Sequence, residues 1–175
     1  ENALAIDLLK KRAAGIEQFV LEDEYRVVAA THARHSLYQG VQHYPLVWLE
    51  DSFEGRVERI LRDYVIDLCA EFVAQHGAEQ GPELFAERLR DSLRNIVKRL
   101  GQERYHHLAS IMDMALAAQH YGEGFHLHRE WIAALLREYY DPMYAYQREK
   151  KASRIEFSGD QAAVVAYLRE RRHQR

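Results

Sequence analysis

The stretch from Tyr44 to Leu68 reads YPLVWLEDSFEGRVERILRDYVIDL and joins a short apolar run to a long amphipathic pattern. The apolar run, residues 46–49, is continuous, as in strands whose two faces are both covered by helices. Asp51 or Ser52 can accept a backbone N–H where a helix begins. The stretch therefore predicts a buried strand and then a helix over 53–75, whose inner face recurs at helical spacing: Val57, Ile60, Leu61, Tyr64, Val65 and Leu68.

Two arginines lie in the first turns of this predicted helix. Arg56 and Arg59 are one turn apart, just beyond a strand, where α/β proteins often hold anionic ligands. Arg59 has Asp63 at i+4, a pair that would also suit an ordinary surface helix. Arg56 has no acidic residue at i+3 or i+4. We therefore expect Arg56 in particular to be available to a diphosphate group.

The composition is that of one globular domain. The chain has 175 residues, 47% hydrophobic and 29% charged, which is too apolar for a disordered segment. No apolar run approaches the ~20 residues of a membrane span, and the N-terminus lacks a signal-peptide pattern, so we expect a cytoplasmic protein without membrane contact. The net charge of -3 excludes a uniformly basic nucleic-acid binder but leaves room for local basic patches. The single cysteine, Cys69, lies on an apolar helix face and is interpreted as a buried core thiol.

The rest of the chain predicts further helices and two short strands. A helix beginning near Asn2 should end at residues 13–15, and Gln18–Leu21 should form a second buried strand. GAEQGP, residues 77–82, is typical of a loop. Helices are then predicted over 82–100, 103–119 and 128–140, the last ending at Asp141-Pro142 before a shorter helix. Residues 154–157 predict a strand, and 161–172 a final helix with Val164, Val165, Tyr167 and Leu168 inward.

Acidic residues follow the predicted strand at 18–21. Glu22, Asp23 and Glu24 come directly after it, with Arg26 just beyond. Nucleotide-binding proteins place carboxylates that coordinate magnesium or position water at such strand ends. A solvated turn is the alternative interpretation of the same residues.

Two further groups could contact nucleic acid. The predicted helix 82–100 carries Arg90, Arg94 and Lys98 at i, i+4 and i+8, either as a phosphate-facing stripe or as a solvated face that Glu87 and Asp91 partly neutralise. A second group interleaves aromatic and basic side chains, which can stack bases and bind phosphates but also pack helix junctions. Its members are Tyr139, Tyr140, Tyr144, Tyr146, Arg148, Lys150, Lys151 and Arg154.

The ten histidines do not predict a metal site. Neither His106-His107 nor the pair His126 and His128 has a third ligand nearby, and cysteine ligands are absent. The chain also lacks the glycine-rich loops G-x-x-x-x-G-K-[ST] and G-x-G-x-x-G that cradle phosphates.

Six segments together resemble the C-terminal half of the bacterial tRNA 2-selenouridine synthase family. They are ENALAIDLLK, FVLEDEYR, PLVWLEDSFEGRVERILRDYV, IVKRLGQERY, LLREYYDPMYAYQ and RIEFSG, in the family's order and over nearly the whole chain. In that family a rhodanese-like domain with the essential cysteine precedes a P-loop domain. The enzyme replaces sulfur by selenium in 2-thiouridine at the tRNA wobble position, with selenophosphate as donor and a geranylated intermediate.

The resemblance implies the fold and partners of this chain. It implies an α/β fold: a helix-rich P-loop-type domain over 1–175 with a small, incomplete parallel sheet and a helical insert at about 78–150. The first strand and Walker A loop would lie outside the chain, so this fragment alone would be inactive. It implies tRNA and the N-terminal rhodanese-like domain as partners, selenophosphate and geranyl diphosphate as substrates of the whole enzyme, and no cofactor in this chain.

The resemblance also implies roles for the candidate residues. Glu22, Asp23, Glu24, Arg26, Arg56 and Arg59 would face the diphosphate end of the site, and the block 139–146 with Arg148, Lys150 and Lys151 would form its wall or contact tRNA. The stripe of Arg90, Arg94 and Lys98 is a further candidate for tRNA. The chain departs from the family where Tyr25 replaces a serine and no glycine follows, which removes any role of that hydroxyl.

Two other interpretations remain open from the sequence. One is a fragment of a P-loop kinase-like phosphotransferase, which an upstream Walker A loop without a rhodanese domain would favour. The other is a non-catalytic helical binding module whose charged stripes are solvated faces.

Overall fold

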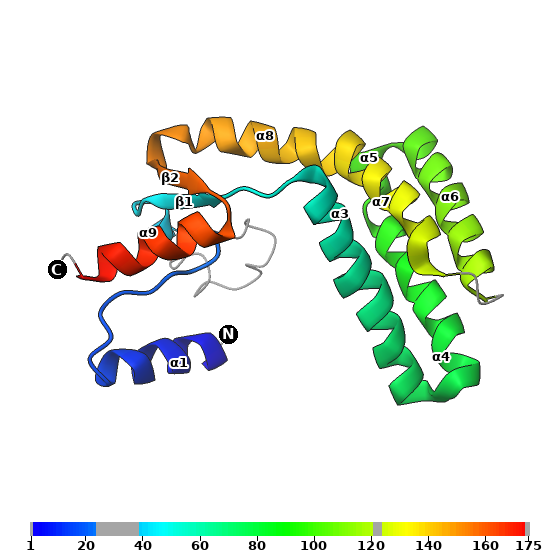
Figure 1. The fold of residues 1–175 in the computed structure, drawn as a ribbon, viewed down its shortest axis with the longest axis horizontal. Coiled ribbons are helices and arrows are strands. Elements are labelled where there is room, and N and C mark those ends of the chain that lie inside the picture. Colours follow the sequence, from blue (N-terminus) through cyan, green and yellow to red (C-terminus); the bar gives the residue numbers. More distant parts are fainter. Residues whose placement is uncertain (1, 24–38, 121–123, 174–175) are drawn as a thin grey trace. The chain divides into compact units, whose positions relative to one another are not determined.

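A computed structural model describes residues 2–23, 39–120 and 124–173 and shows a helix-rich α/β fold (Figure 1). Strands β1 (Leu46–Leu49) and β2 (Ile155–Gly159) pair in a two-stranded parallel sheet. Beyond β1, the amide of Glu50 donates to the Gly159 carbonyl at 2.8 Å. Helices α1 (Asn2–Ala13) and α9 (Gln161–His173) lie near the two ends of the chain. The predicted fold class, helix-rich with a small parallel sheet, is confirmed.

The chain divides into two compact units. The first comprises Glu1–Trp48 with Arg154–Ser158, and the second, called the helical unit below, comprises Leu49–Ser153 with Gly159–Arg175. The single domain over 1–175 and the insert at about 78–150 stay predictions.

The junction between β1 and the next helix forms as its sequence predicts. Ser52 caps α3 (Phe53–Leu61), and its hydroxyl accepts a hydrogen bond from the Gly55 amide at 2.9 Å. A Cβ at position 55 would lie 2.5 Å from Asp51 Oδ1, so the Asp51 side chain would have to move to admit any residue other than glycine. The strand itself is only partly covered, since Leu49 is 52% exposed. The prediction of a fully buried strand is therefore wrong.

The helix continues from α3 through a π turn, η2 (Arg62–Asp67), into α4 (Leu68–Asn95). Its buried residues recur at every fourth position: Val57, Leu61, Val65 and Cys69. Four residues advance an ideal α-helix by about 40° beyond one full turn, and the wider π turn reduces this drift. Tyr64 is consequently 62% exposed, and its predicted place on the inner face is wrong.

The chain reverses direction at Gly77, where the predicted helix 53–75 ends. Gly77 has φ 84° inside α4, a left-handed conformation that suits glycine. Residues 78–81 are already helical, so the predicted loop 77–82 shrinks to this one turn. Gly81 is buried against the backbone of Val73, which brings the two arms of α4 close together (Figure 1).

The remaining helices complete a packed core. The predicted helix 82–100 is interrupted at Ile96, after which α5 (Val97–Leu100) ends before Gly101, where the helix was predicted to end, and α6 (Gln102–His120) follows. After η3 (Phe125–Leu127), the helical path continues through α7 (His128–Leu135), the π turn η4 (Leu136–Tyr140) and α8 (Asp141–Lys150) to η5 (Ala152–Arg154). The core residues of α4 to η4 include Phe85, Leu89, Leu93, Leu100, Leu108, Ile111, Met112, Trp131, Ile132 and Leu136.

The predicted break at Asp141-Pro142 does not occur. In η4 the Asp141 amide donates to the carbonyl of Leu136, five residues back, and Pro142 falls in the first turn of α8, where its missing N–H costs little. The prediction of a helix end at this site is therefore wrong, because the π turn accommodates the proline.

The predicted strand at 18–21 is also absent from the structure. These residues are not paired in a sheet, and Phe19, Val20 and Leu21 are 37%, 73% and 38% exposed. A strand needs a neighbour for its backbone hydrogen bonds, and the described sheet pairs only β1 with β2. On α9, Val165 is 39% exposed, so its predicted inward position is wrong as well.

No described helix combines the length and the apolar character that crossing a membrane requires.

Candidate functional site

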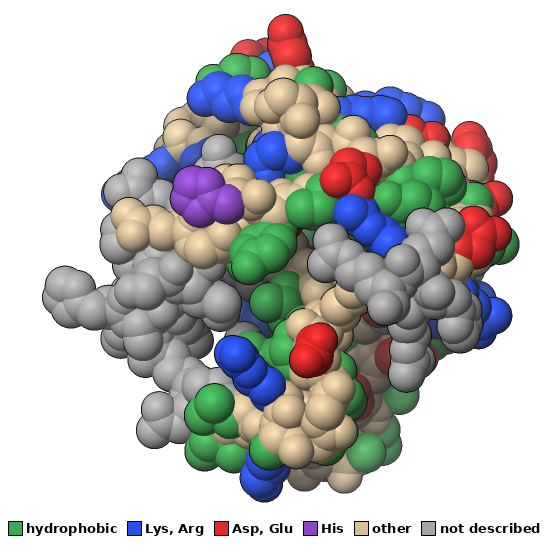
Figure 2. Space-filling view, turned by 90° about the vertical axis from the view of Figure 1, so that its left-hand side faces the viewer, with side chains coloured by type: hydrophobic (Ala, Val, Ile, Leu, Met, Phe, Trp, Pro, Cys, Tyr) green, Lys and Arg blue, Asp and Glu red, His purple; other side chains and the backbone are tan. Residues whose placement is uncertain are grey.

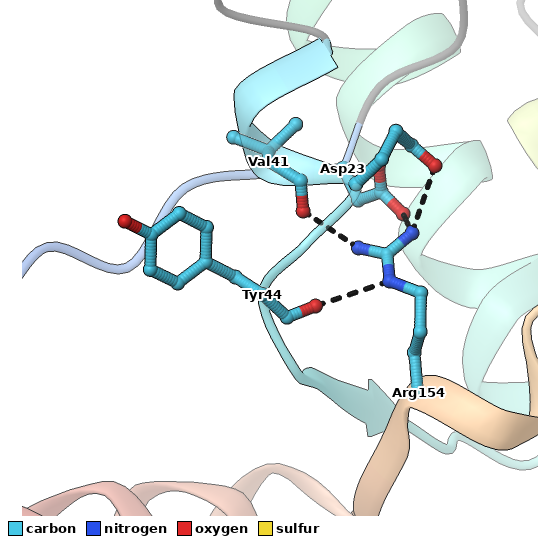
Figure 3. A network of polar contacts seen from close by, with 5 residues as sticks. Asp23, Val41, Tyr44 and Arg154 are labelled. Atoms are coloured by element: carbon cyan, nitrogen blue, oxygen red, sulfur yellow. Dashed lines mark hydrogen bonds and ion pairs between the residues drawn. The ribbon is translucent and has the colours of Figure 1, made fainter.

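Arg154 forms an ion pair with Asp23, one residue of the predicted acidic segment. Glu22 is exposed, while Asp23 is mostly buried and lies 3.9 Å from Arg154 as an ion pair. Arg154 Nη2 donates to the Val41 carbonyl at 2.8 Å and Nε to the Tyr44 carbonyl at 3.0 Å, so that the guanidinium points into the turn before β1 (Figure 3). Its Nη1 donates to Gln42 at 2.9 Å. Glu24 and Arg26 lie outside the described residues.

Arg154 is thus structural in this region. A planar guanidinium can satisfy several acceptors at fixed angles, which a lysine cannot do. The sequence placed Arg154 at the end of a basic run, but no local pattern indicated that its partners are more than a hundred residues earlier in the chain.

Arg56 has an acidic partner that its neighbours in sequence do not reveal. Its two terminal nitrogens donate to the two carboxylate oxygens of Asp141, the second at 3.1 Å. Both side chains are 31% exposed, and the hydrogen bond to Asp141 raises the pKa of Arg56. The expectation that Arg56 lacks an acidic partner is wrong, because Asp141 lies on α8, far along the sequence. Its role in binding a diphosphate stays a prediction.

Arg59 also pairs differently from the local pattern. Its Nη2 lies 2.7 Å from Asp51 Oδ2, and not beside Asp63. Asp51 precedes the cap of α3, so Arg59 and Asp51 close the same first turns that Ser52 and Gly55 shape. Arg59 remains 53% exposed and can still meet a ligand.

Phe53 lies at the centre of a basic cluster formed with Arg56 and Arg137. The guanidinium of Arg137, from η4, lies 4.3 Å from the centre of the Phe53 ring, and that of Arg56 lies 5.5 Å from it. A cation over an aromatic face gains electrostatic stabilisation without losing its charge. Arg137 is exposed, and among the described residues it has no carboxylate partner. Neither Arg137 nor Asp141 was among the predicted site residues, although both stand in LLREYYDPMYAYQ, one of the segments that carry the family resemblance.

The predicted basic stripe on α4 and α5 is largely paired. Arg90 Nε lies 2.7 Å from Asp113 on α6, and Arg94 pairs with Asp91 on its own helix. Lys98 is exposed and has no carboxylate partner in the described part of the chain. The structure therefore favours a surface on which carboxylates neutralise Arg90 and Arg94, while the charge of Lys98 is left without a described carboxylate partner.

The tyrosine and lysine group divides in two. Tyr139 and Tyr140 are half-buried and pack against the core. Tyr144 and Tyr146 are 49% and 54% exposed, and Lys150 lies 4.5 Å from the centre of the Tyr146 ring. Beyond them, Arg148 lies 2.7 Å from Glu50, and Lys151 is partly buried.

A largely buried chain of hydrogen bonds links four residues of the helical unit. The Trp131 indole donates to His128 Nδ1 at 2.9 Å, His128 Nε2 lies 2.9 Å from Gln119 Oε1, and the Gln119 amide donates to Cys69 Sγ at 3.3 Å. Burial lowers the pKa of His128 to about 4 and raises the pKa of Cys69. His128 is therefore a neutral core residue that donates through Nε2, and Cys69 is the buried thiol that the sequence predicts.

The positions of the predicted site residues bear on two possible ligands, a metal ion and a phosphate group. The described residues contain no group of three or more His, Cys, Asp or Glu side chains that could hold a metal ion. Arg56 and Arg137 instead lie beside the Phe53 ring, and Arg59 belongs to the same helix, α3. Guanidinium groups are well suited to anionic phosphate groups. Lys and Arg side chains also lie among hydrophobic ones on one face of the molecule (Figure 2). The binding of anionic ligands by these arginines stays a prediction, and the described residues around them offer no evident nucleophile.

Comparison with known proteins places this sequence in a family. The family model described as "tRNA 2-selenouridine synthase AAA domain" matches residues 1–175. The tRNA 2-selenouridine synthase of Azotobacter vinelandii is 68% identical over 97% of this chain and 46% of its own length. Those of Pseudomonas putida strain W619 and Bordetella petrii are 66% and 61% identical, over 98% and 97% of the chain.

The chain spans about half the length of the curated relatives that it matches. No solved structure shows a significant match to it. The family model covers the chain from end to end, and the relatives are more than 60% identical over almost all of it. The chain therefore belongs to the AAA domain family of tRNA 2-selenouridine synthases.

Proposed function

We propose that this chain is the substrate-holding part of a tRNA 2-selenouridine synthase. The observation that carries the proposal is the 61–68% identity to tRNA 2-selenouridine synthases over nearly the whole chain. The whole enzyme would replace sulfur by selenium in 2-thiouridine at the tRNA wobble position, with selenophosphate as donor and through a geranylated intermediate. A rhodanese-like domain would supply the reactive cysteine, in keeping with the burial of Cys69 in this chain.

The basic cluster around Phe53 is proposed to hold the diphosphate of the prenyl donor. Arg137 supports this assignment because its charge is exposed and, among the described residues, has no carboxylate partner. Arg56 is held in place by Asp141, and a diphosphate would exchange with that carboxylate for the same two N–H groups. Arg59, fixed by Asp51, would add a third cation at the same helix start.

The P-loop itself is proposed to lie outside this chain. The acidic segment Glu22–Glu24 would then stand at the phosphate side of the complete fold, with Asp23 positioned by Arg154. Binding of selenophosphate and geranyl diphosphate, the cytoplasmic location, and tRNA contact through Lys98, Tyr144, Tyr146 and Lys150 belong to the same proposal.

The test is selenium transfer by the full-length protein. Purified enzyme receives tRNA bearing 2-thiouridine, geranyl diphosphate and selenophosphate, and the modified nucleosides are identified by mass. The wild type should form 2-selenouridine, and Arg137→Ala should lower the rate at least tenfold, an effect of about 1.4 kcal/mol on the transition state. Arg62→Ala, at an exposed position of the same helical path, should retain the wild-type rate. Absence of the product with wild-type enzyme would overturn the proposal.

A further inference from the structure

Three tyrosines of the helical unit are in ring contact, and a fourth, Tyr64, acts electrostatically on one of them. The rings of Tyr139 and Tyr140 meet edge to face with centres 4.9 Å apart. Tyr140 and Tyr144 are stacked, with ring centres 6.3 Å apart and planes tilted by 24°. Burial raises the pKa of Tyr140, and so, to a smaller extent, do Tyr139, Tyr144 and Tyr64, which lie near the same hydroxyl. We call Tyr64, Tyr139, Tyr140 and Tyr144 the tyrosine platform.

The two π turns place these side chains. Tyr64 lies in η2, and Tyr139 and Tyr140 lie in η4. A π turn re-aims the side chains around it and is frequent at functional sites. Because η2 turns the residues at every fourth position inward, Tyr64 faces outward and not into the core.

The outer members of the platform are more exposed than packing alone requires. Tyr64 is 62% exposed and Tyr144 is 49% exposed, whereas Tyr139 and Tyr140 pack against the core. Large aromatic side chains left at the surface in one cluster indicate a binding surface. Arg99, on α5, lies close enough to lower the pKa of Tyr140, is itself exposed, and has no carboxylate partner among the described residues.

We propose that the tyrosine platform, with Arg99, stacks an unpaired base of an RNA substrate and binds its adjacent phosphate. Exposed aromatic faces and guanidinium groups are the elements with which proteins hold unstacked bases and the phosphates next to them. This assignment rests on the proposed function, in which the whole enzyme acts on tRNA, and it names the surface that would hold one of the bases.

The chemistry favours a base over a prenyl chain at this place. A prenyl chain gains most from an enclosed apolar cavity, whereas the outer two rings of the platform are open to water. The phenol hydroxyls and the guanidinium offer hydrogen bonds and charge, which suit the edges and phosphate of a nucleotide.

The experiment uses the full-length protein and an RNA stem–loop with 2-aminopurine at an unpaired loop position. Stacking on tyrosine should quench the fluorescence of 2-aminopurine. Tyr64→Ala and Tyr144→Ala should each weaken binding about fivefold or more and reduce the quenching, while Tyr64→Phe and Tyr144→Phe keep both. Arg99→Gln should weaken binding and lower the salt dependence by about one counterion, whereas the tyrosine variants leave that dependence unchanged.

Tyr44→Ala is the matched control. Tyr44 is 67% exposed and belongs to the first unit, and alanine keeps the backbone carbonyl that Arg154 binds. Tyr64 and Tyr144 variants that behave like Tyr44→Ala, in a protein whose wild type binds the RNA, would overturn the platform and leave the proposed function standing. Loss of geranyl diphosphate affinity with unchanged RNA affinity would also overturn it. A wild-type protein that binds neither this RNA nor tRNA would instead refute the proposed function, and the platform with it.

Discussion

A bidentate ion pair between Arg56 and Asp141 joins the first turn of α3 to the first turn of α8. Arg56→Ala would leave the Asp141 carboxylate, 31% exposed, without this partner. We expect the variant to lower the free energy of unfolding by about 1 kcal/mol, because half-buried, bidentate pairs exceed the usual surface pair. Denaturant unfolding of the protein measures this loss.

A variant with both residues changed separates the free energy of the Arg56–Asp141 interaction from the effect of each substitution alone. Asp141→Asn alone should also destabilise the protein, and the combination with Arg56→Ala should cost less than the sum of the two single changes. Arg62→Ala, at an exposed position in the same helical path, should change the unfolding free energy by less than about 0.5 kcal/mol. Strictly additive effects would mean that the ion pair contributes nothing to stability.

His128 makes the stability of the helical unit sensitive to acid. Its pKa is about 4 in the folded protein and 6.5 when exposed, so the unfolded state takes up the proton first. This contribution is fully present above about pH 6.5 and is lost as the pH falls toward 4. We expect it to reduce the unfolding free energy by about 2 kcal/mol between about pH 7.5 and about pH 5.

The pH dependence of a His128→Gln variant isolates this one histidine from the others. Glutamine can keep a hydrogen bond to Gln119 or Trp131 but cannot titrate. Its unfolding free energy should therefore decline less over the same pH range than that of the wild type. Identical slopes for the two proteins would show that His128 is not the group responsible.

At the scale of the element, the two arms of α4 meet at Gly81. A Cβ added there would lie 2.6 Å from Val73 Cα and 2.8 Å from Val73 N. Because both contacts are to backbone, the helix hairpin at Gly77 would have to open. We expect Gly81→Ala to lower the melting temperature, with a loss of about 1–3 kcal/mol in unfolding free energy.

Gly124→Ala is the matched control for this substitution. The nearest described atom to a Cβ at Gly124 is His126 Nδ1 at 3.6 Å, an ordinary van der Waals distance. Its melting temperature should stay close to that of the wild type. A Gly81→Ala protein as stable as Gly124→Ala would contradict the close approach of the two arms.

The elements that local sequence specifies were the ones predicted correctly. Ser52 as a cap, Gly77 and Gly101 as helix ends and the strand at β1 all depend on neighbouring residues. The two π turns were missed because an α-helical period of 3.6 assumes that no residue is inserted. That assumption placed Tyr64 inside. The helix end at Asp141 was predicted because proline usually pushes the residue before it out of the helical region, which does not happen here. The strand predicted at 18–21 failed because pairing depends on a neighbouring strand, not on the apolar run alone.

At the scale of the whole molecule, the candidate site depends on long-range pairing. The sequence identified Arg56 and the block 139–146 separately, but it could not show that Asp141 neutralises Arg56 or that Arg137 stacks on Phe53. Ion pairs between distant segments have no periodic signature. The family resemblance depends on long matching segments. It therefore predicted the family correctly, whereas the partners of individual charged residues could not be predicted.

The paired and unpaired cations should differ in how they respond to salt when tRNA binds. The net charge of -3 cannot attract a polyanion as a whole, so binding must depend on local cations that are free of carboxylates. For the full-length protein we expect Lys98→Gln to reduce the slope of log affinity against log salt by about 0.9, one phosphate contact. Arg90→Gln should leave the slope nearly unchanged, because Asp113 already neutralises that charge at 2.7 Å. Filter binding over a range of salt concentrations measures both slopes, and an equal reduction by the two variants would refute the distinction between paired and unpaired cations.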